Sequence, residues 1–211
     1  MSAKPSSASP RPASPTIIGA RRRALAMLLP ASLLAGCGSS PPVQLYRLPS
    51  AAPVSAPGTA ATNETWQLLL PVRIPDYLDR DALLMPQGEA GLLALSGHRW
   101  AESLREAVPR VLREDLIALL GEGRVWVSPL PAGLTITRRL RVELQAFDVG
   151  ADRRSVRLQA RWSLVDPAGA QPPRSAAADL VEAAASERID DLVAAHRLAL
   201  WHLAKRIVAS R

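Results

Sequence analysis

The sequence is poor in the residues and motifs from which many binding sites are built. It contains one cysteine, Cys37, which excludes an intramolecular disulfide and any zinc site made of several cysteines. One phenylalanine and two tyrosines accompany five tryptophans, so no platform for stacking nucleic-acid bases is evident. No serine-hydrolase elbow, phosphate-binding glycine loop, HExxH or dinucleotide-binding glycine pattern occurs. An enzyme assignment has no positive support, and we expect no catalytic residue, cofactor or metal.

Acidic residues are absent before Cys37, whereas five basic residues lie there. They are Lys4, Arg11, Arg21, Arg22 and Arg23. The whole chain has 26 Lys and Arg against 19 Asp and Glu and an isoelectric point of about 10.8. Without those five residues, 21 basic residues remain against 19 acidic ones. The high isoelectric point therefore belongs mostly to the N-terminal segment, and we expect no nucleic-acid partner.

No apolar run near the N-terminus is long enough to cross a membrane. Residues 24–34 form an apolar run much shorter than the roughly 20 residues that a spanning helix needs. The run follows Arg21-Arg22-Arg23 and ends in small residues, which is the order found in a secretory signal. We predict that residues 1–36 are a signal peptide with an extended, proline-rich n-region.

The predicted cleavage region contains a more specific pattern. Leu34, Ala35, Gly36 and Cys37 resemble the lipobox of bacterial lipoprotein precursors, in which the cysteine thiol is lipidated and the chain is cut before it. The alternative is a buried, inert cysteine in an apolar helix. We favour lipidation of Cys37 because the only cysteine directly follows a small-residue pair at the end of a signal-like run. Acyl chains on that residue would anchor the protein stably. Resemblance to enterobacterial lipoproteins implies that Gly38 favours the outer membrane over the inner, with the chain facing the periplasm.

Proline divides the mature chain into two parts. Ten of the 19 prolines lie before residue 60. We predict that residues 37–64 hold the anchor, a short strand at 43–48 and an Ala/Pro-rich stretch, and that residues 65–211 form the folded domain. If the short strand pairs with a sheet, residues 49–63 are a loop. If it does not, the two segments form one long tether.

The folded part alternates strand and helix patterns. Shorter strands are predicted at 66–72, 124–128 and 176–181, and the apolar runs at 83–85 and 91–95 predict two strands or one strand and a turn. The alternation at 140–146 and 156–164 predicts a long antiparallel hairpin whose apolar face includes Ala146 and Trp162, with Phe147 and Arg161 on the polar face. Helical spacing predicts one helix over 100–120, kinked or restarted near residue 108 by Pro109, and a second from Ser186. The expected fold is α/β, a small mixed β-sheet with a long antiparallel hairpin packed against two main helices.

Several polar and aromatic residues are candidates for function. The histidines, His98, His196 and His202, lack the spacing of a helical metal pair. The adjacent acidic pairs Glu114-Asp115 and Asp190-Asp191 are best explained as solvated helix faces. Arg141, Arg157 and Arg161 lie on the polar face of the hairpin, where a solvated face is favoured over a basic binding surface. Trp201 and Val208 widen the apolar stripe of the last helix, so they form a candidate partner surface, unless the sheet and a neighbouring loop bury both sides.

Six motifs in this order resemble the ABC-type transport auxiliary lipoproteins, the family that includes paraquat-inducible protein C. Besides the lipobox cysteine, the motifs are LYRLP at 45–49, LPVRIPDYLDR at 70–80, RWAESL at 99–104, REDL at 113–116, FD at 147–148 and ARWSL at 160–164. They extend over nearly the whole mature chain. The long insertion after Pro49 and the extended n-region depart from the family.

The resemblance implies a non-catalytic role. Members of the family accompany MCE-domain periplasmic proteins and integral inner-membrane partners in systems thought to move lipids across the periplasm. Two other functions remain open: a purely structural envelope lipoprotein that does not contact lipid cargo, and a periplasmic hydrolase with an unrecognised site. The sequence leaves open whether the chain forms a homo-oligomer, which cargo is moved and whether the domain binds lipid.

Overall fold

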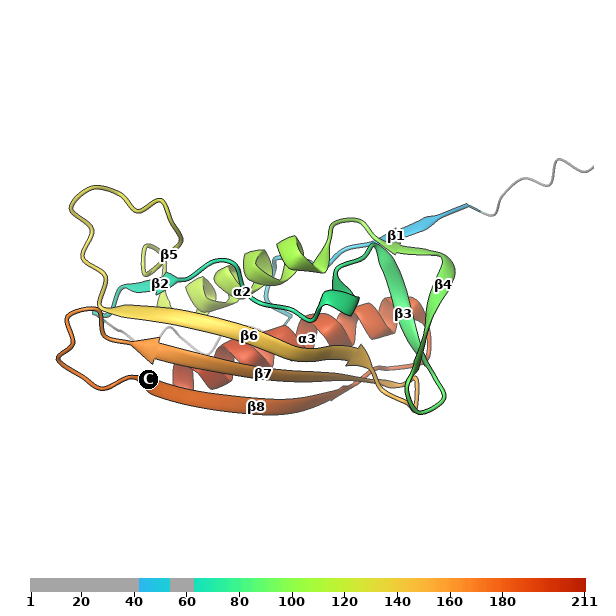
Figure 1. The fold of residues 1–211 in the computed structure, drawn as a ribbon. Helices are drawn as coiled ribbons and strands as arrows, with labels where there is room; N and C mark the ends of the chain where they lie inside the picture. Colours follow the sequence, from blue (N-terminus) through green and yellow to red (C-terminus); the bar gives the residue numbers. More distant parts are fainter. Residues whose placement is uncertain (1–41, 54–62) are drawn as a thin grey trace, which may run out of the picture. The chain divides into compact units, whose positions relative to one another are not determined.

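The computed structural model describes residues 42–53 and 63–211. These residues form two open β-sheets and two main helices, which confirms the predicted α/β class (Figure 1). The larger sheet has the order β5-β2-β6-β7-β8. Its strands are β2 (Trp66–Leu68), β5 (Val125–Trp126), β6 (Arg138–Val149), β7 (Ser155–Val165) and β8 (Arg174–Ala183). β2 runs parallel to β5 and β6, whereas β6, β7 and β8 are antiparallel, so the sheet is mixed.

The predicted hairpin is present as β6 and β7, but a bulge changes its register. Leu144 lies opposite Ala160, whereas Ala146 lies opposite Gln159, so β6 contains one extra residue between them. The extra residue shifts the alternation, and Phe147 therefore faces the core while Ala146 is only half-buried. The predicted faces of Ala146 and Phe147 were wrong for this reason. Before the bulge and along β7 the predicted faces are confirmed.

Three of the strands form a second sheet, which the sequence patterns did not predict. It has the order β1-β4-β3, with β1 at Gln44–Tyr46, β3 at Ala82–Gln87 and β4 at Gly91–Trp100. The predicted short strand near residue 45 is therefore paired, parallel to β4. β2 is shorter than predicted, and the chain rejoins the large sheet only at an isolated bridge between Arg73 and Glu143. The short 3-10 helix η2 (Asp76–Leu78) follows that bridge.

α2 (Leu104–Leu120) is one helix, so of the two alternatives predicted near residue 108, a kink or a restart, the restart was wrong. Ser103 caps it by accepting a hydrogen bond from the backbone N–H of Glu106, and Gly121 ends it with a backbone φ of 107°. Pro109 lies inside the second turn and removes one backbone donor. Trp100, which was predicted to lie in this helix, ends β4 instead.

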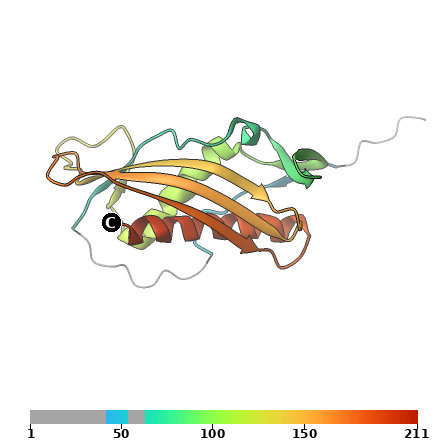
Figure 2. The ribbon, with the colours of Figure 1, turned by 60° about the horizontal axis from the view of Figure 1, so that its bottom comes forward.

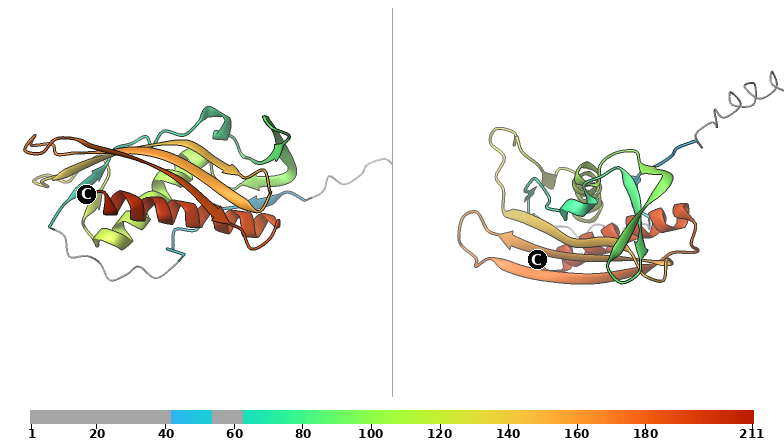
Figure 3. Two further views of the ribbon diagram at one scale, coloured as in Figure 1. Left: turned by 90° about the horizontal axis from the view of Figure 1, so that it is seen from below. Right: turned by 45° about the vertical axis from the view of Figure 1, so that its right-hand side comes forward.

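α3 (Ile189–Ala209) packs against β7 and β8, and α2 packs beside α3 (Figures 2 and 3). The core lies between these helices and the inner face of the sheet, and its largest fully buried side chains include Trp66, Trp201 and Phe147. In the described part of the chain, no helix or strand covers the outer face of β6, β7 and β8. Neither α2 nor α3, nor any other helix of the described residues, is long and apolar enough to span a membrane.

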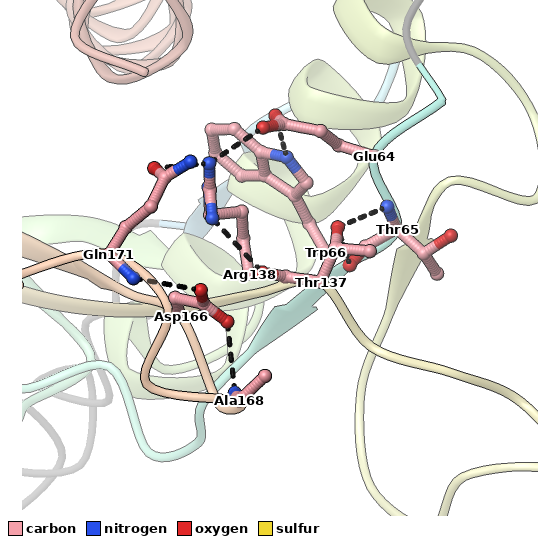
Figure 4. A network of polar contacts seen from close by, with 8 residues as sticks. All are labelled: Glu64, Thr65, Trp66, Thr137, Arg138, Asp166, Ala168 and Gln171. Carbon is pink, nitrogen blue, oxygen red and sulfur yellow. Dashed lines mark hydrogen bonds and ion pairs between the residues drawn. The ribbon is translucent and has the colours of Figure 1, made fainter.

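Polar contacts fasten one end of the large sheet (Figure 4). Arg138 at the start of β6 forms an ion pair with Glu64 at 3.1 Å and donates to Gln171 Oε1 at 2.9 Å. Gln171 lies in the turn before β8, and its backbone N–H donates to Asp166 at 3.1 Å. Trp66 Nε1 donates to Glu64 at 3.0 Å. These contacts join the starts of β2 and β6 to the turn that precedes β8.

Candidate functional site

The lipobox residues Leu34, Ala35, Gly36 and Cys37 lie outside the described residues. The lipid anchor at Cys37 therefore remains a prediction.

Trp201 does not lie on the surface of the domain. Its side chain is only 1% exposed and belongs to the main core cluster, and Val208 is half-buried against the same cluster. α3 is enclosed on several sides, by the sheet, by α2 and by the segment that follows β1. The candidate partner surface at Trp201 and Val208 is therefore corrected to part of the core.

The three histidines are distributed over separate environments. His196 is buried, its ring edge lies against Phe147 and Trp100, and its Nδ1 bonds the Leu192 carbonyl at 2.8 Å. His98 stacks on Tyr46, and His202 contacts Glu182 on β8. Among the described residues no group of three His, Cys, Asp or Glu side chains could hold a metal ion.

An ion pair between α2 and α3 is buried in the core. Asp115 is 0% exposed, and Arg197 donates to both of its carboxylate oxygens, one of them at 2.9 Å. The prediction of a solvated face was therefore wrong for Asp115. Burial raises the pKa of the Asp115 carboxyl to about 6, against the opposing effect of Arg197. The one signal in the sequence is that Arg197 falls between Val193 and Leu200 on the apolar stripe of α3.

Arg197 also holds the chain that follows β1. Its guanidinium donates to the carbonyls of Pro49, Ser50 and Ala51, at 2.7, 3.3 and 2.9 Å. Arg110 of α2 donates to the Leu48 carbonyl at 3.1 Å and to Ser50 Oγ at 2.6 Å, and it pairs with Glu102. Four successive backbone carbonyls are thus bound by two arginines. This arrangement fixes the N-terminal end of the domain to both helices.

The outer face of the large sheet carries arginines beside small residues. Arg141 and Arg161 line a shallow hollow of about 440 Å³ together with Ser163, Ser175 and Ala177, and Glu143, which lies opposite Arg161, lines it too. Arg157 on the same face is paired with Asp179 at 2.6 Å, and this hydrogen bond lowers the pKa of Asp179 to about 2. Neither Arg141 nor Arg161 has an ion pair within the described ranges. A face of this kind can attract a negatively charged surface.

The buried His196 predicts a pH-dependent stability. Burial lowers the pKa of His196 to about 4, from an ordinary value of 6.5. The unfolded chain therefore binds more protons between these pH values, and stability is lost as the pH falls from about 7 to 4, by at most about 3 kcal/mol. The contribution of Asp115 to stability changes with pH in the opposite direction, because its raised pKa favours the folded state as the pH falls below 6.

The test compares unfolding by urea at several pH values in the parent chain and in His196→Gln. The contribution of Asp115 is the same in both proteins, so it cancels in the difference between their free energies of unfolding. We expect that difference to shrink as the pH falls, because only the parent must keep a buried imidazole neutral. A difference that is constant between pH 4 and 7 would show that His196 does not titrate in this range.

Comparison with known proteins identifies the family. The model of the family described as ABC-type transport auxiliary lipoprotein component matches residues 46–208. The chain belongs to this family. No curated protein matches the auxiliary lipoprotein.

Two solved structures show the same fold as this auxiliary lipoprotein. The first is the crystal structure of an uncharacterized protein, which is 18% identical to this chain and has a TM-score of 0.62. The alignment covers 79% of this chain and 96% of that chain. The second, from Xanthomonas campestris, is 13% identical with a TM-score of 0.61, and covers 78% of this chain and 92% of that chain. At these identities the likeness concerns the fold alone.

The motifs on which the resemblance rests take part in the contacts of the auxiliary lipoprotein. Tyr77 donates to Asp148 at 2.6 Å, which joins η2 to the end of β6. Arg105 donates to Asp79 at 2.7 Å, which joins η2 to α2. Asp115 of the REDL motif is the buried partner of Arg197. These three contacts connect η2, β6, α2 and α3, so the motif residues that make them contribute to the fold.

Proposed function

We propose that this protein is a lipid-anchored, periplasmic auxiliary subunit of an MCE-type system that moves lipids between membranes, and that it acts by binding partners and not by catalysis. The observation that carries the proposal is the family match over residues 46–208. In this role Cys37 is lipidated and holds the chain in the outer membrane. The partners are an MCE-domain periplasmic protein and, through it, an integral inner-membrane protein.

The short connection between anchor and domain supports this role. Gln44, at the start of β1, is the seventh residue after Cys37, and a chain of that length spans at most about 25 Å. The arginine contacts to residues 48–51 then hold the next part of the chain on α2 and α3. An anchored protein would therefore keep its domain close to the membrane surface.

The anchor is tested by Cys37→Ala. We expect this variant to remain as an uncleaved precursor in the inner membrane and to lose labelling by a fatty-acid probe, because the thioether acceptor is absent. The matched control is Gly38→Ala, which leaves the cysteine in place. Normal maturation of Cys37→Ala would refute the lipid anchor.

The outer face of β6, β7 and β8 is the surface we propose for the partner. It is the broad face left uncovered by α2 and α3. Three arginines, Arg139, Arg141 and Arg161, are exposed on it beside one carboxylate, Glu143. Charges on such a surface change association rates and specificity more than they change folding. An MCE-domain protein with an acidic surface would be complementary to it.

The test measures binding of the periplasmic part of an MCE-domain protein encoded nearby. We expect binding by the parent, an affinity about tenfold lower for Arg141→Glu, and no change for Lys205→Glu, which makes the same charge change at an exposed position of α3. Equal binding by both variants would exclude this face. If the parent itself binds no MCE-domain protein from its own genome, the transport role fails and a purely structural envelope lipoprotein takes its place.

A further inference from the structure

Exposed apolar side chains gather in the smaller sheet, which has the order β1-β4-β3. In the described part of the chain six large apolar side chains are exposed, and two of them, Leu70 and Val181, belong to the region of the larger sheet. The other four lie in the smaller sheet or directly before it, and they are Val43, Leu45, Leu92 and Leu93. Single exposed apolar residues are common on protein surfaces, whereas several that gather in one place mark an interaction site.

The register of β3 with β4 creates one apolar face that points away from the core. Pro86 lies opposite Leu92, and Leu84 lies opposite Ala94. Residues directly opposite each other project from the same side of a sheet, so these four side chains are neighbours. Leu92 and Ala94 are exposed, and Leu84 and Pro86 are half-buried, whereas the alternate residue Leu83 is buried in the core. We call the four residues the hairpin face.

The β3-β4 hairpin lies at the end of the domain where the chain enters it (Figures 1 and 3). Gln44, at the start of β1, is paired with His98 of β4, and the proposed lipid anchor at Cys37 lies within about 25 Å of Gln44. Arg153 in the β6-β7 turn donates to the Pro86 carbonyl at 3.2 Å, so this turn is at the same end. β7 then runs for 11 residues, which places the β7-β8 turn about 35 Å away.

Charged residues beside the hairpin face restrict how it can meet another surface. The turn between β3 and β4 carries the exposed carboxylate of Glu89, which resists burial in an apolar phase. Arg99 near the end of β4 is paired with Asp81 at 2.8 Å, so these two residues add no net charge. The side of the hairpin, and not its tip, is therefore the part suited to contact with an apolar phase, and that contact rests on apolar area.

We propose that the hairpin face lies on the phospholipid surface of the membrane that holds the anchor, with Leu92 at the boundary between headgroups and acyl chains. The inference rests on the proposed lipidation of Cys37. An anchor within about 25 Å gives the hairpin a high effective concentration at the bilayer, so an apolar contact too weak to bind a free protein is sufficient. The bilayer is favoured over a protein partner because the anchor itself brings this apolar phase to this end of the domain. The contact holds the domain in one orientation, with the β7-β8 turn directed away from the membrane.

Fluorescence quenching of the full mature chain in vesicles tests the proposal. Ala94→Cys places a thiol on the hairpin face without removing a leucine, and the dye NBD is attached there while the lipidated Cys37 is blocked by its thioether. The vesicles contain phosphatidylethanolamine, phosphatidylglycerol and a lipid with a nitroxide close to its headgroup. We expect the nitroxide to quench about half of the emission, because the dye lies at the headgroup boundary. The matched control is Ala168→Cys in the β7-β8 turn, which is equally small and exposed and should not be quenched.

A second pair of variants tests whether the apolar side chains make the contact. In the labelled Ala94→Cys chain, Leu92→Ser should lower the ratio of membrane-bound to free hairpin about fivefold, because a half-exposed leucine contributes about half of its apolar area. The control Val181→Ser removes an exposed apolar side chain from β8 and should leave the quenching unchanged. High salt should also leave it unchanged, because the contact does not depend on charge. Equal effects of the two serine variants, or release of the hairpin by salt, would contradict the proposal.

The outcomes separate this inference from the anchor on which it rests. If the parent chain takes up the dye, the Cys37 thiol is free, and both the anchor and the membrane contact are refuted. If the parent remains unlabelled and the dye at residue 94 is not quenched, the anchor is retained and the membrane contact alone is refuted. A dye shielded both from the nitroxide lipid and from iodide in the water would show that protein covers the hairpin face, which also overturns the proposal. The vesicles contain no MCE-domain protein, so the result does not depend on that partnership.

Discussion

Asp115→Ala is expected to lower the free energy of unfolding by about 3–5 kcal/mol, because it leaves the Arg197 guanidinium buried without its counter-ion. Arg197 is enclosed between α2, α3 and the carbonyls of residues 49–51, so water cannot replace the carboxylate without opening that contact. Urea unfolding at pH 7 measures the loss. At that pH Asp115 is ionised in the parent, since its pKa is raised only to about 6.

The neighbouring residue gives the control for this experiment. Glu114 contacts Arg113 at 2.9 Å with about two-fifths of each side chain exposed, and Glu114→Ala should change stability by no more than about 1 kcal/mol. The double variant Asp115→Leu/Arg197→Met should lose less than the sum of its single variants, because no unpaired charge remains. Strict additivity, or equal effects at positions 114 and 115, would show that the pair is not coupled as the structure implies.

Trp162→Ala is expected to have an effect of similar size, about 3–5 kcal/mol, because it removes a large side chain from a packed core. Trp162 is 5% exposed, lies between Val142 of β6 and Ala176 of β8, and donates from Nε1 to Ser210 Oγ at 2.9 Å. Loss of the indole would leave a cavity and would also free the C-terminal end of α3. Denaturation midpoints measured by circular dichroism report the change.

The adjacent Arg161 is the matched control for Trp162. It lies on the opposite face of β7 and is exposed, so in the absence of a partner Arg161→Ala should alter stability by no more than about 0.5 kcal/mol. Similar midpoints for the two variants would contradict the observed faces of β7.

Features that depend on local sequence were predictable. The β6-β7 hairpin up to Leu144 and the stripe of α3 follow from periodicity, because alternation and 3.6-residue spacing each require only near neighbours in the chain. The order of the six motifs pointed to the family that the comparison then identified. The anchor at Cys37 also rests on a local pattern, and it remains to be tested by the Cys37→Ala experiment.

Features that depend on contacts between distant segments were not predictable. The face of Phe147 depends on one extra residue in β6, which alternation alone does not reveal. The burial of Trp201 depends on the sheet, α2 and the segment after β1 enclosing α3 together. Asp115 and Arg197 are 82 residues apart, so the position of Arg197 on the apolar stripe of α3 does not reveal the residue with which it pairs.

By itself the sequence determined the class of fold, the two main helices, the long hairpin and the resemblance to an auxiliary lipoprotein, because these depend on composition, period and the order of short motifs. Only the tertiary structure decided which apolar residues are core and which charges are paired. It also decided that the strands divide into two sheets and that β8 is the last strand of the larger one among the described residues. The physical reason is that burial and pairing depend on which distant surfaces meet, and a residue's neighbours along the chain do not specify them.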